Sequence, residues 1–236
     1  MEGNYREVVV AVDPRVICEG HNLTVKGEVG MLFNCFSQLA EQGAKICLFS
    51  WIPGMKDLER IQAQVSSFKF DWLVTSANLK DYLQASGIPE DRADYRYVTG
   101  FNARAPQHKS LTLFGGPGKL VIALVTSMSL INETRTFMDR LSNSQDVRDM
   151  YPRVRVAHVM PCLTRPDSGK WSTRGEISNR TLFVNITGQV RSWAQEAAKG
   201  SHLYAAPLEI FTPNTLSLTS NGHGFRSPVI PWDRED

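Results

Sequence analysis

Lys119-Leu-Val-Ile-Ala-Leu-Val-Thr126 is the strongest strand pattern in this chain of 236 residues. Its apolar side chains do not alternate with polar ones, which is typical of a strand buried on both faces of a parallel sheet. Similar apolar runs occur before and after it. The predicted strands are residues 7–12, 44–51, 70–75, 119–126 and 153–160, with a weaker pattern at 95–98 and a last strand at the run His202-Leu-Tyr-Ala-Ala206.

Amphipathic segments with helical spacing separate these strands. The predicted helices are residues 27–42, 55–68, 76–83, 130–150 and 177–199, and Gly43 and Gly200 are placed to end two of them. Strands that alternate with helices predict an α/β fold with a mostly parallel sheet flanked by helices. No repeat or linker divides the chain, so we expect residues 1–236 to form a single doubly wound domain.

Composition excludes few function classes, because 26 basic residues face 24 acidic ones. The distribution is more informative. Residues 95–119 hold four bases and no acid, and residues 153–191 hold seven bases and two acids, whereas the first 67 residues hold six bases and eight acids. These two positive segments indicate an anion-binding surface if the fold brings them together; otherwise they are solvated basic loops.

The four cysteines lie far apart and show no metal-ligand spacing, so we expect no metal and no cofactor. Cys35 and Cys47 lie in apolar runs and are expected to be buried free thiols. The chain shows no signal peptide and no apolar run of about 18 residues. We therefore expect a reduced, cytoplasmic protein that does not enter a membrane, cut as a domain from a longer chain.

Function in a parallel α/β sheet collects beyond the carboxyl ends of the strands. From residue 119 onward, the order of strands, helices and the final His223 turn resembles that of SGNH (GDSL-type) hydrolases. Such an enzyme needs a nucleophilic serine, and an acid that orients a basic histidine. Ser220 stands where the acid is expected, and no Gly-Asp-Ser turn follows an early strand. Ser50 is the one remaining candidate nucleophile.

Two segments combine basic and aromatic side chains in the way that single-stranded RNA requires, with cations for phosphates and a ring for an unpaired base. One lies around Trp171 and the other follows Phe101. The alternative for Trp171 is a hydrophobic cover over the core. The candidate RNA-binding residues are Arg104, His108, Lys109, Arg165, Lys170, Trp171, Arg174, Arg180 and Arg226, and the vestigial hydrolase positions are Ser220 and His223.

Four stretches are similar to one family. They are His21-Asn-Leu-Thr-Val-Lys-Gly27, Ser50-Trp-Ile-Pro-Gly54, the segment from Asp71 to Leu83, and Ser220-Asn-Gly-His-Gly-Phe-Arg-Ser-Pro228. They resemble the C-terminal OSK domains of the Oskar family, the insect germ-plasm organisers. The resemblance implies an SGNH-like fold without catalytic residues, which binds mRNA 3′ untranslated regions, such as those of nanos and oskar, in pole-plasm assembly for pole cell formation. It further implies germ-plasm proteins as partners and localisation in germ granules at the oocyte posterior.

Three functions remain open from the residues alone. The first is an RNA-binding pseudoenzyme, which is not catalytic. The second is an active esterase that uses Ser50 and His223. The third is a protein-interaction scaffold, for which an exposed apolar patch would be the positive sign.

Overall fold

The computed structural model describes residues 4–51, 54–89, 92, 110–141, 148–159 and 179–213. Six parallel strands form its main sheet in the order β5-β4-β1-β6-β7-β8. Chain order runs outward from β1 in one direction and from β6 in the other, as in a doubly wound sheet. The strands of this sheet are β1 (Val8–Val12), β4 (Lys45–Ser50), β5 (Trp72–Thr75), β6 (Leu120–Val125), β7 (Arg153–His158) and β8 (Leu208–Phe211).

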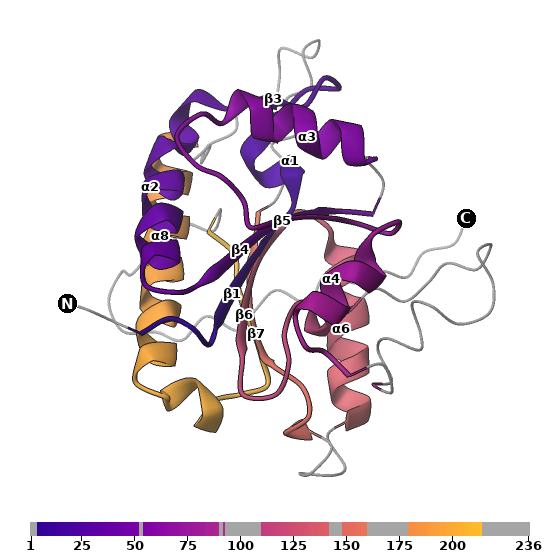
Figure 1. The fold of residues 1–236 in the computed structure, drawn as a ribbon. Coiled ribbons are helices and arrows are strands. Elements are labelled where there is room, and N and C mark those ends of the chain that lie inside the picture. Colours follow the sequence, from indigo (N-terminus) through magenta and orange to yellow (C-terminus); the bar gives the residue numbers. More distant parts are fainter. Residues whose placement is uncertain are drawn as a thin grey trace, which may run out of the picture.

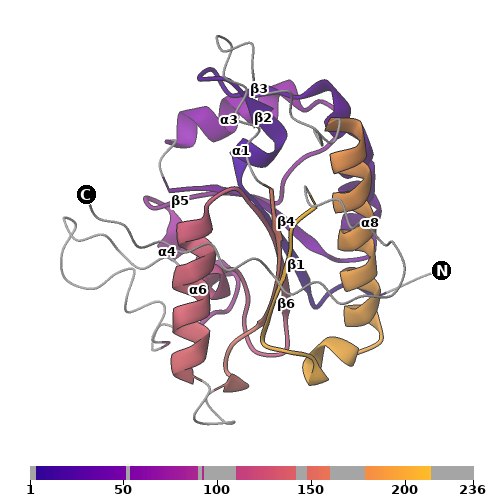
Figure 2. The same ribbon diagram turned by 180° about the vertical axis from the view of Figure 1, so that it is seen from behind.

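Helices cover both faces of the sheet (Figure 1). The helices α2 and α8 lie side by side on one face, and α4 and α6 cover the other, as the view from behind also shows (Figure 2). The helical segments are α1 (Pro14–Ile17), η1 (Gly27–Val29), α2 (Gly30–Glu41), α3 (Met55–Gln64), α4 (Leu79–Ala85), η2 (Leu111–Phe114), α6 (Met128–Leu141), α8 (Asn179–Ala198) and η3 (Ser201–Tyr204).

The central strands are buried on both faces because their side chains alternate between two apolar layers. In β1, Val8, Val10 and Val12 belong to the layer under α1, α2, α3 and α8. Val9 and Ala11 belong to the layer under α4, η2 and α6. This two-sided burial confirms the α/β, doubly wound fold class predicted from the continuous apolar runs.

Gly43 was predicted to end a helix, and it follows α2 with a φ of +99°. That left-handed conformation favours glycine. An added Cβ would also lie 2.9 Å from Cγ of Arg6, so the turn has no room for a side chain. The turn directs the chain from α2 into β4.

The predicted strand at residues 202–206 is wrong. Residues 201–204 form the 3-10 segment η3, and the last strand, β8, starts at Leu208 after Pro207. His202 is 2% exposed and its Nε2 lies 3.0 Å from the carbonyl oxygen of Gly118, whereas Tyr204 is 93% exposed. In a strand, residues 202 and 204 would lie on the same face, so a buried His202 and an exposed Tyr204 are the pattern of a helical turn.

Other boundaries differ less. The predicted helix at 130–150 is α6, which ends at Leu141, and the predicted strand at 95–98 lies outside the described residues. A small antiparallel pair, β2 (Cys18–Glu19) and β3 (Thr24–Val25), has no counterpart in the sequence prediction. No helix in the described part of the chain combines the length and apolarity needed to cross a bilayer.

Candidate functional site

The carboxyl edge of the sheet is the set of turns that follow β1, β4, β5, β6 and β7. These strands are neighbours in the sheet and run in the same direction, so their turns come together at one edge. The first described residues of these turns are Asp13, Trp51, Ser76, Thr126 and Val159. The sequence predicts function here, and the polar contacts of each turn show what chemistry its side chains retain.

Asp13 lies between β1 and β6, where the order of the sheet reverses and a doubly wound protein usually holds its ligand. Its Oδ1 accepts a hydrogen bond from the amide of Arg15 at 2.9 Å, which caps the short helix α1. Its Oδ2 accepts hydrogen bonds from Oγ1 of Thr126 at 2.9 Å and from the Thr126 amide at 3.4 Å. The carboxylate therefore joins β1 to β6 and has a structural role.

Ser50, the candidate nucleophile, is the last residue of β4 and is only 7% exposed. It lies opposite Thr75 of β5, which is 5% exposed. The neighbouring Trp51 packs against Phe49 and Phe114, with ring centroids 5.9 and 6.3 Å apart. The Ser50 hydroxyl thus lies in a packed strand end, whereas a nucleophile must be open to substrate.

The polar groups of the turn after β5 form hydrogen bonds with one another and with the end of the strand. Oδ1 of Asn78 accepts hydrogen bonds from the amide of Thr75 at 2.7 Å and from its Oγ1 at 3.2 Å. Nδ2 of Asn78 donates to the carbonyl oxygen of Leu73 at 2.8 Å. An oxyanion hole needs donors aimed at open space where substrate charge develops. The Asn78 side chain instead closes the turn.

The turn after β6 begins α6. Oγ of Ser127 accepts a hydrogen bond from the amide of Leu130 at 3.3 Å, as a residue at the start of a helix does. His158, at the end of β7, lies opposite Val125 and is half buried. It brings an imidazole ring to the carboxyl edge. Sequence reasoning missed His158 because it ends a strand and belongs to no motif; only the strand register locates it.

The structure describes one of the predicted RNA-binding residues, Arg180, which is exposed in the first turn of α8. The other candidates lie outside the described residues. They are Arg104, His108, Lys109, Arg165, Lys170, Trp171, Arg174 and Arg226, together with Ser220 and His223, the positions predicted to be vestigial.

The described residues that precede the two basic segments lie in different places: Val159 is at the carboxyl end of β7, and Arg92 is near its amino end. Residues 160–178 follow the carboxyl end of β7 and precede α8. Residues 93–109 follow Arg92, which donates hydrogen bonds to the carbonyl oxygens of Gly115 at 2.6 Å and Thr112 at 2.8 Å. The guanidinium of Arg92 also lies 4.8 Å from the ring centroid of Tyr151, near the amino end of β7. The described residues therefore join the segment at 160–178 directly to the carboxyl edge, whereas the segment at 93–109 follows a residue bonded to η2 and stacked on Tyr151.

Three cysteines are buried free thiols, as predicted for Cys35 and Cys47. Burial raises the pKa of Cys18 and Cys47 from an ordinary value of 9.0 to about 12, and it raises the pKa of Cys35 in the same direction. A buried neutral thiol is a poor nucleophile and a poor metal ligand. Within the described ranges, no cluster of three or more His, Cys, Asp or Glu is placed to hold a metal ion.

Comparison with known proteins adds no relative to this picture. No protein-family model matches the chain, and no curated protein sequence matches it significantly. The functional argument therefore depends on the fold and on the residues themselves.

Proposed function

We propose that this chain is a catalytically inactive, SGNH-like domain of the OSK type that binds mRNA through single-stranded segments, including 3′ untranslated regions, in cytoplasmic germ-plasm assembly. The observation that carries the proposal is the structural use of polar groups at the carboxyl edge. Asp13 joins two strands, Asn78 closes its own turn, and Ser50 is buried. A hydrolase that lacks several members of its catalytic set retains little activity.

Charge supports RNA as the ligand. Residues 160–178 follow the carboxyl end of β7, and this part of the chain carries Arg165, Lys170 and Arg174 with Trp171 among them. The exposed Arg180 adds a fourth cation at the start of α8. Cations that neutralise phosphates and a ring that stacks on a base are the two requirements for binding single-stranded RNA.

We expect the triple variant Arg165→Glu, Lys170→Glu and Arg174→Glu to bind single-stranded RNA about 100-fold more weakly at moderate salt, because three phosphate contacts become repulsive. Fluorescence anisotropy with a labelled 3′ untranslated region fragment measures the affinity, and a salt series measures the number of phosphates neutralised. The slope of log affinity against log salt should fall by about 2 in the variant, since each contact to a single strand contributes ~0.7.

A matched control separates this surface from total charge. Lys69, Arg140 and Lys199 are exposed and lie toward the amino ends of the strands. Their triple replacement by Glu changes the net charge by the same amount and should preserve most of the affinity. Equal losses in both triple variants would show that binding follows net charge alone, and an unchanged affinity in the first variant would reject the surface at 160–178.

The absence of catalysis has its own test. We expect hydrolysis of p-nitrophenyl acetate at the rate of buffer alone, with no difference between the wild type, Ser50→Ala and His223→Ala, because the Ser50 hydroxyl lies in a packed strand end. Release of nitrophenolate is followed by absorbance. Turnover above buffer that disappears in either variant would establish the esterase and refute the pseudoenzyme.

A further inference from the structure

Two neighbouring hollows lie at the amino ends of β7 and β8, the opposite end of the sheet from the carboxyl edge. The first has a volume of about 410 Å³ and is lined by Arg153, Leu203 and Tyr204, among other residues. The second has a volume of about 440 Å³ and lies between α6 and β8. The turn before β7 borders both hollows, because its Asp149 lines the first and its Arg148 lines the second. We call the two hollows and this turn the amino-edge surface.

Apolar side chains are unusually exposed on the amino-edge surface. Tyr204 is 93% exposed and Leu203 is 44% exposed, and Met150 of the intervening turn is 42% exposed. These are three of the six large apolar or aromatic side chains that are exposed in the described part of the chain. Tyr, Met and Arg are the residue types enriched where proteins bind one another. Leu203 and Tyr204 line the first hollow, and Met150 lies between two of its lining residues in sequence, which favours a protein-interaction surface here.

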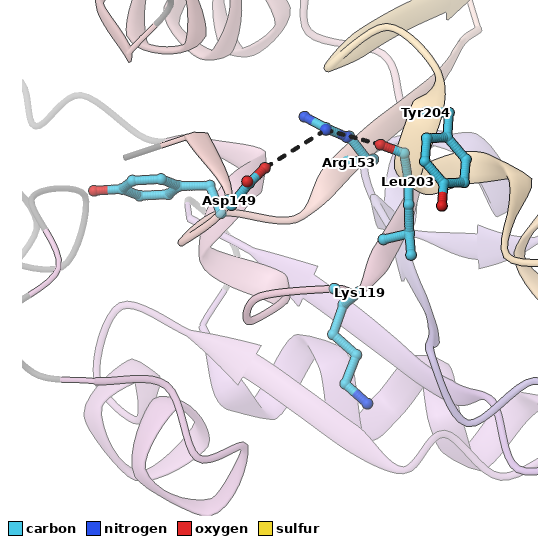
Figure 3. A pocket seen from close by; sticks show the side chains of 7 residues that line it. Lys119, Asp149, Arg153, Leu203 and Tyr204 are labelled. Atoms are coloured by element: carbon cyan, nitrogen blue, oxygen red, sulfur yellow. Dashed lines mark hydrogen bonds and ion pairs between the residues drawn. The ribbon is translucent and has the colours of Figure 1, made fainter. Parts of the chain in front are cut away.

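Arg153 is held in a fixed orientation in the first hollow. Its Nη2 donates a hydrogen bond to the carbonyl oxygen of Leu203 at 2.9 Å and lies 3.9 Å from Oδ1 of Asp149, and its side chain is 13% exposed. Figure 3 shows Arg153 between Asp149 on one side and Leu203 with Tyr204 on the other. Lys119 extends away from this group and pairs with Glu7 at 3.0 Å.

The second hollow has an apolar floor and a cationic rim. Met138 of α6 and the β8 residues Leu208 and Ile210 supply the apolar part. Arg135 is exposed and forms no ion pair with a described residue, and Nε of Arg148 is buried without a hydrogen-bond partner in the same part of the chain. With Arg153, three arginines line the two hollows against two carboxylates, Asp139 and Asp149.

The strand β8 borders the second hollow and is the last strand of the sheet. Among the described residues it pairs only with β7, and none of them adds a strand to its other edge, whose backbone donors and acceptors a further strand would use. An extended peptide can add to such an edge by backbone hydrogen bonds, and its alternate side chains then fill the adjacent hollow. Side chains on the α6 face of an added strand would lie over Met138 and Ile210.

From these observations we propose that the amino-edge surface binds an extended acidic segment of a partner protein, which adds as a strand to β8. Apolar side chains of the segment occupy the hollow between α6 and β8. Its carboxylates pair with Arg135 and Arg148, and a side chain beyond the strand packs on Tyr204. This binding is separate from the proposed RNA binding, because it uses the opposite end of the sheet.

The lining favours a peptide over a nucleic acid. The hollow beside β8 is aliphatic, with Met138, Leu208 and Ile210, whereas base recognition uses aromatic stacking platforms. Two carboxylates, Asp139 and Asp149, lie among the three arginines, so the surface offers no continuous run of cations for a phosphate backbone. A peptide can present its carboxylates singly, and its extended backbone matches the repeat of β8.

The test selects random peptides of about 12 residues displayed on phage against the whole chain, a length that spans the surface at ~3.3 Å per residue. We expect enriched sequences in which acidic and apolar residues alternate. A synthetic enriched peptide should bind Tyr204→Ala, and separately Arg135→Ala with Arg148→Ala, at least about 10-fold more weakly than the wild type. Fluorescence anisotropy measures both affinities, and circular dichroism checks that each variant is folded.

Matched variants decide what a loss means. Lys56→Ala with Lys69→Ala removes two exposed cations on the β5 side of the sheet, the opposite side from β8, and should leave peptide affinity unchanged. Tyr204→Ala should bind RNA as tightly as the wild type does. The variant therefore tests peptide binding separately from the proposed RNA binding. The proposal is overturned by a selection that enriches no peptide or only basic ones, or by equal peptide binding to all variants. RNA that displaces the peptide and binds Tyr204→Ala weakly would also overturn it, in favour of a nucleic-acid surface.

Discussion

Replacing Glu209 by Ala is expected to lower the free energy of unfolding by about 3 kcal/mol, because it leaves the charge of Arg155 buried without its ion-pair partner. Arg155 is fully buried in β7, and its Nε lies 3.1 Å from Oε2 of Glu209 in β8. Burial lowers the pKa of Arg155, and the charge of Glu209 opposes that effect. Since the Glu209 side chain is 48% exposed, its loss should cost the lower part of the ~3–5 kcal/mol range for breaking a buried pair.

Two further variants isolate the cause. Glu209→Gln keeps an acceptor for Nε1 of Trp193, which donates to Oε1 of Glu209 at 3.2 Å, and removes only the charge. The double change Arg155→Leu with Glu209→Leu removes both charges and should be close to neutral. Urea denaturation measures all three free energies. A cost below about 1 kcal/mol for Glu209→Ala, or an equally large cost for the double change, would contradict the buried-charge explanation.

A loss of similar size is expected for Arg92→Ala, about 3–4 kcal/mol, because the change removes a buried guanidinium that satisfies two carbonyl oxygens. Arg92 is 1% exposed, donates to the carbonyls of Gly115 and Thr112, and stacks on Tyr151. It therefore joins η2 to the turn before β7. Thermal and urea unfolding, each followed by circular dichroism, measure the change.

The control for Arg92 is Arg60, whose Nη2 lies 3.1 Å from Oδ1 of Asp57 on the surface of α3. Arg60→Ala removes an exposed ion pair and should cost less than about 0.5 kcal/mol. Comparable effects of the two substitutions would mean that the carbonyl contacts of Arg92 contribute little to stability.

The sheet was predictable because its central strands are buried on both faces. Such strands have continuous apolar runs, which are easily recognised in the sequence. The run at 119–126 contains β6, and the strands predicted at 7–12 and 153–160 are its neighbours β1 and β7. The last strand was not predictable by pattern, because β8 is an edge strand that carries Glu209. Glu209 pairs with Arg155, which explains a charged residue in this strand. The two residues are far apart in the sequence, so the pattern did not show this contact. The run at 202–206, which contains no Asp, Glu, Lys or Arg, attracted the prediction instead.

The candidate site was predictable in position and less so in chemistry. Sequence order placed Asp13, Ser50 and Asn78 at the ends of strands, where the structure has them. It could not show that the Asp13 carboxylate bonds to Thr126, because that contact joins residues 113 positions apart. The amino-edge surface was missed altogether, since Arg148, Arg153 and Tyr204 belong to separate segments that only the folded sheet brings together.

The central position of β1 has a consequence for synthesis of the chain. Residue 8 pairs with residue 120, so one edge of β1 has no partner until β6 has been made. At ~5–20 residues per second, the ribosome needs roughly 6–22 s to supply those residues. During that interval the β5-β4-β1 half of the sheet exposes the valine-rich edge of β1, and unpaired strand edges of this kind promote aggregation. The nascent chain is therefore most vulnerable before its second half emerges, and chaperone demand should be greatest then.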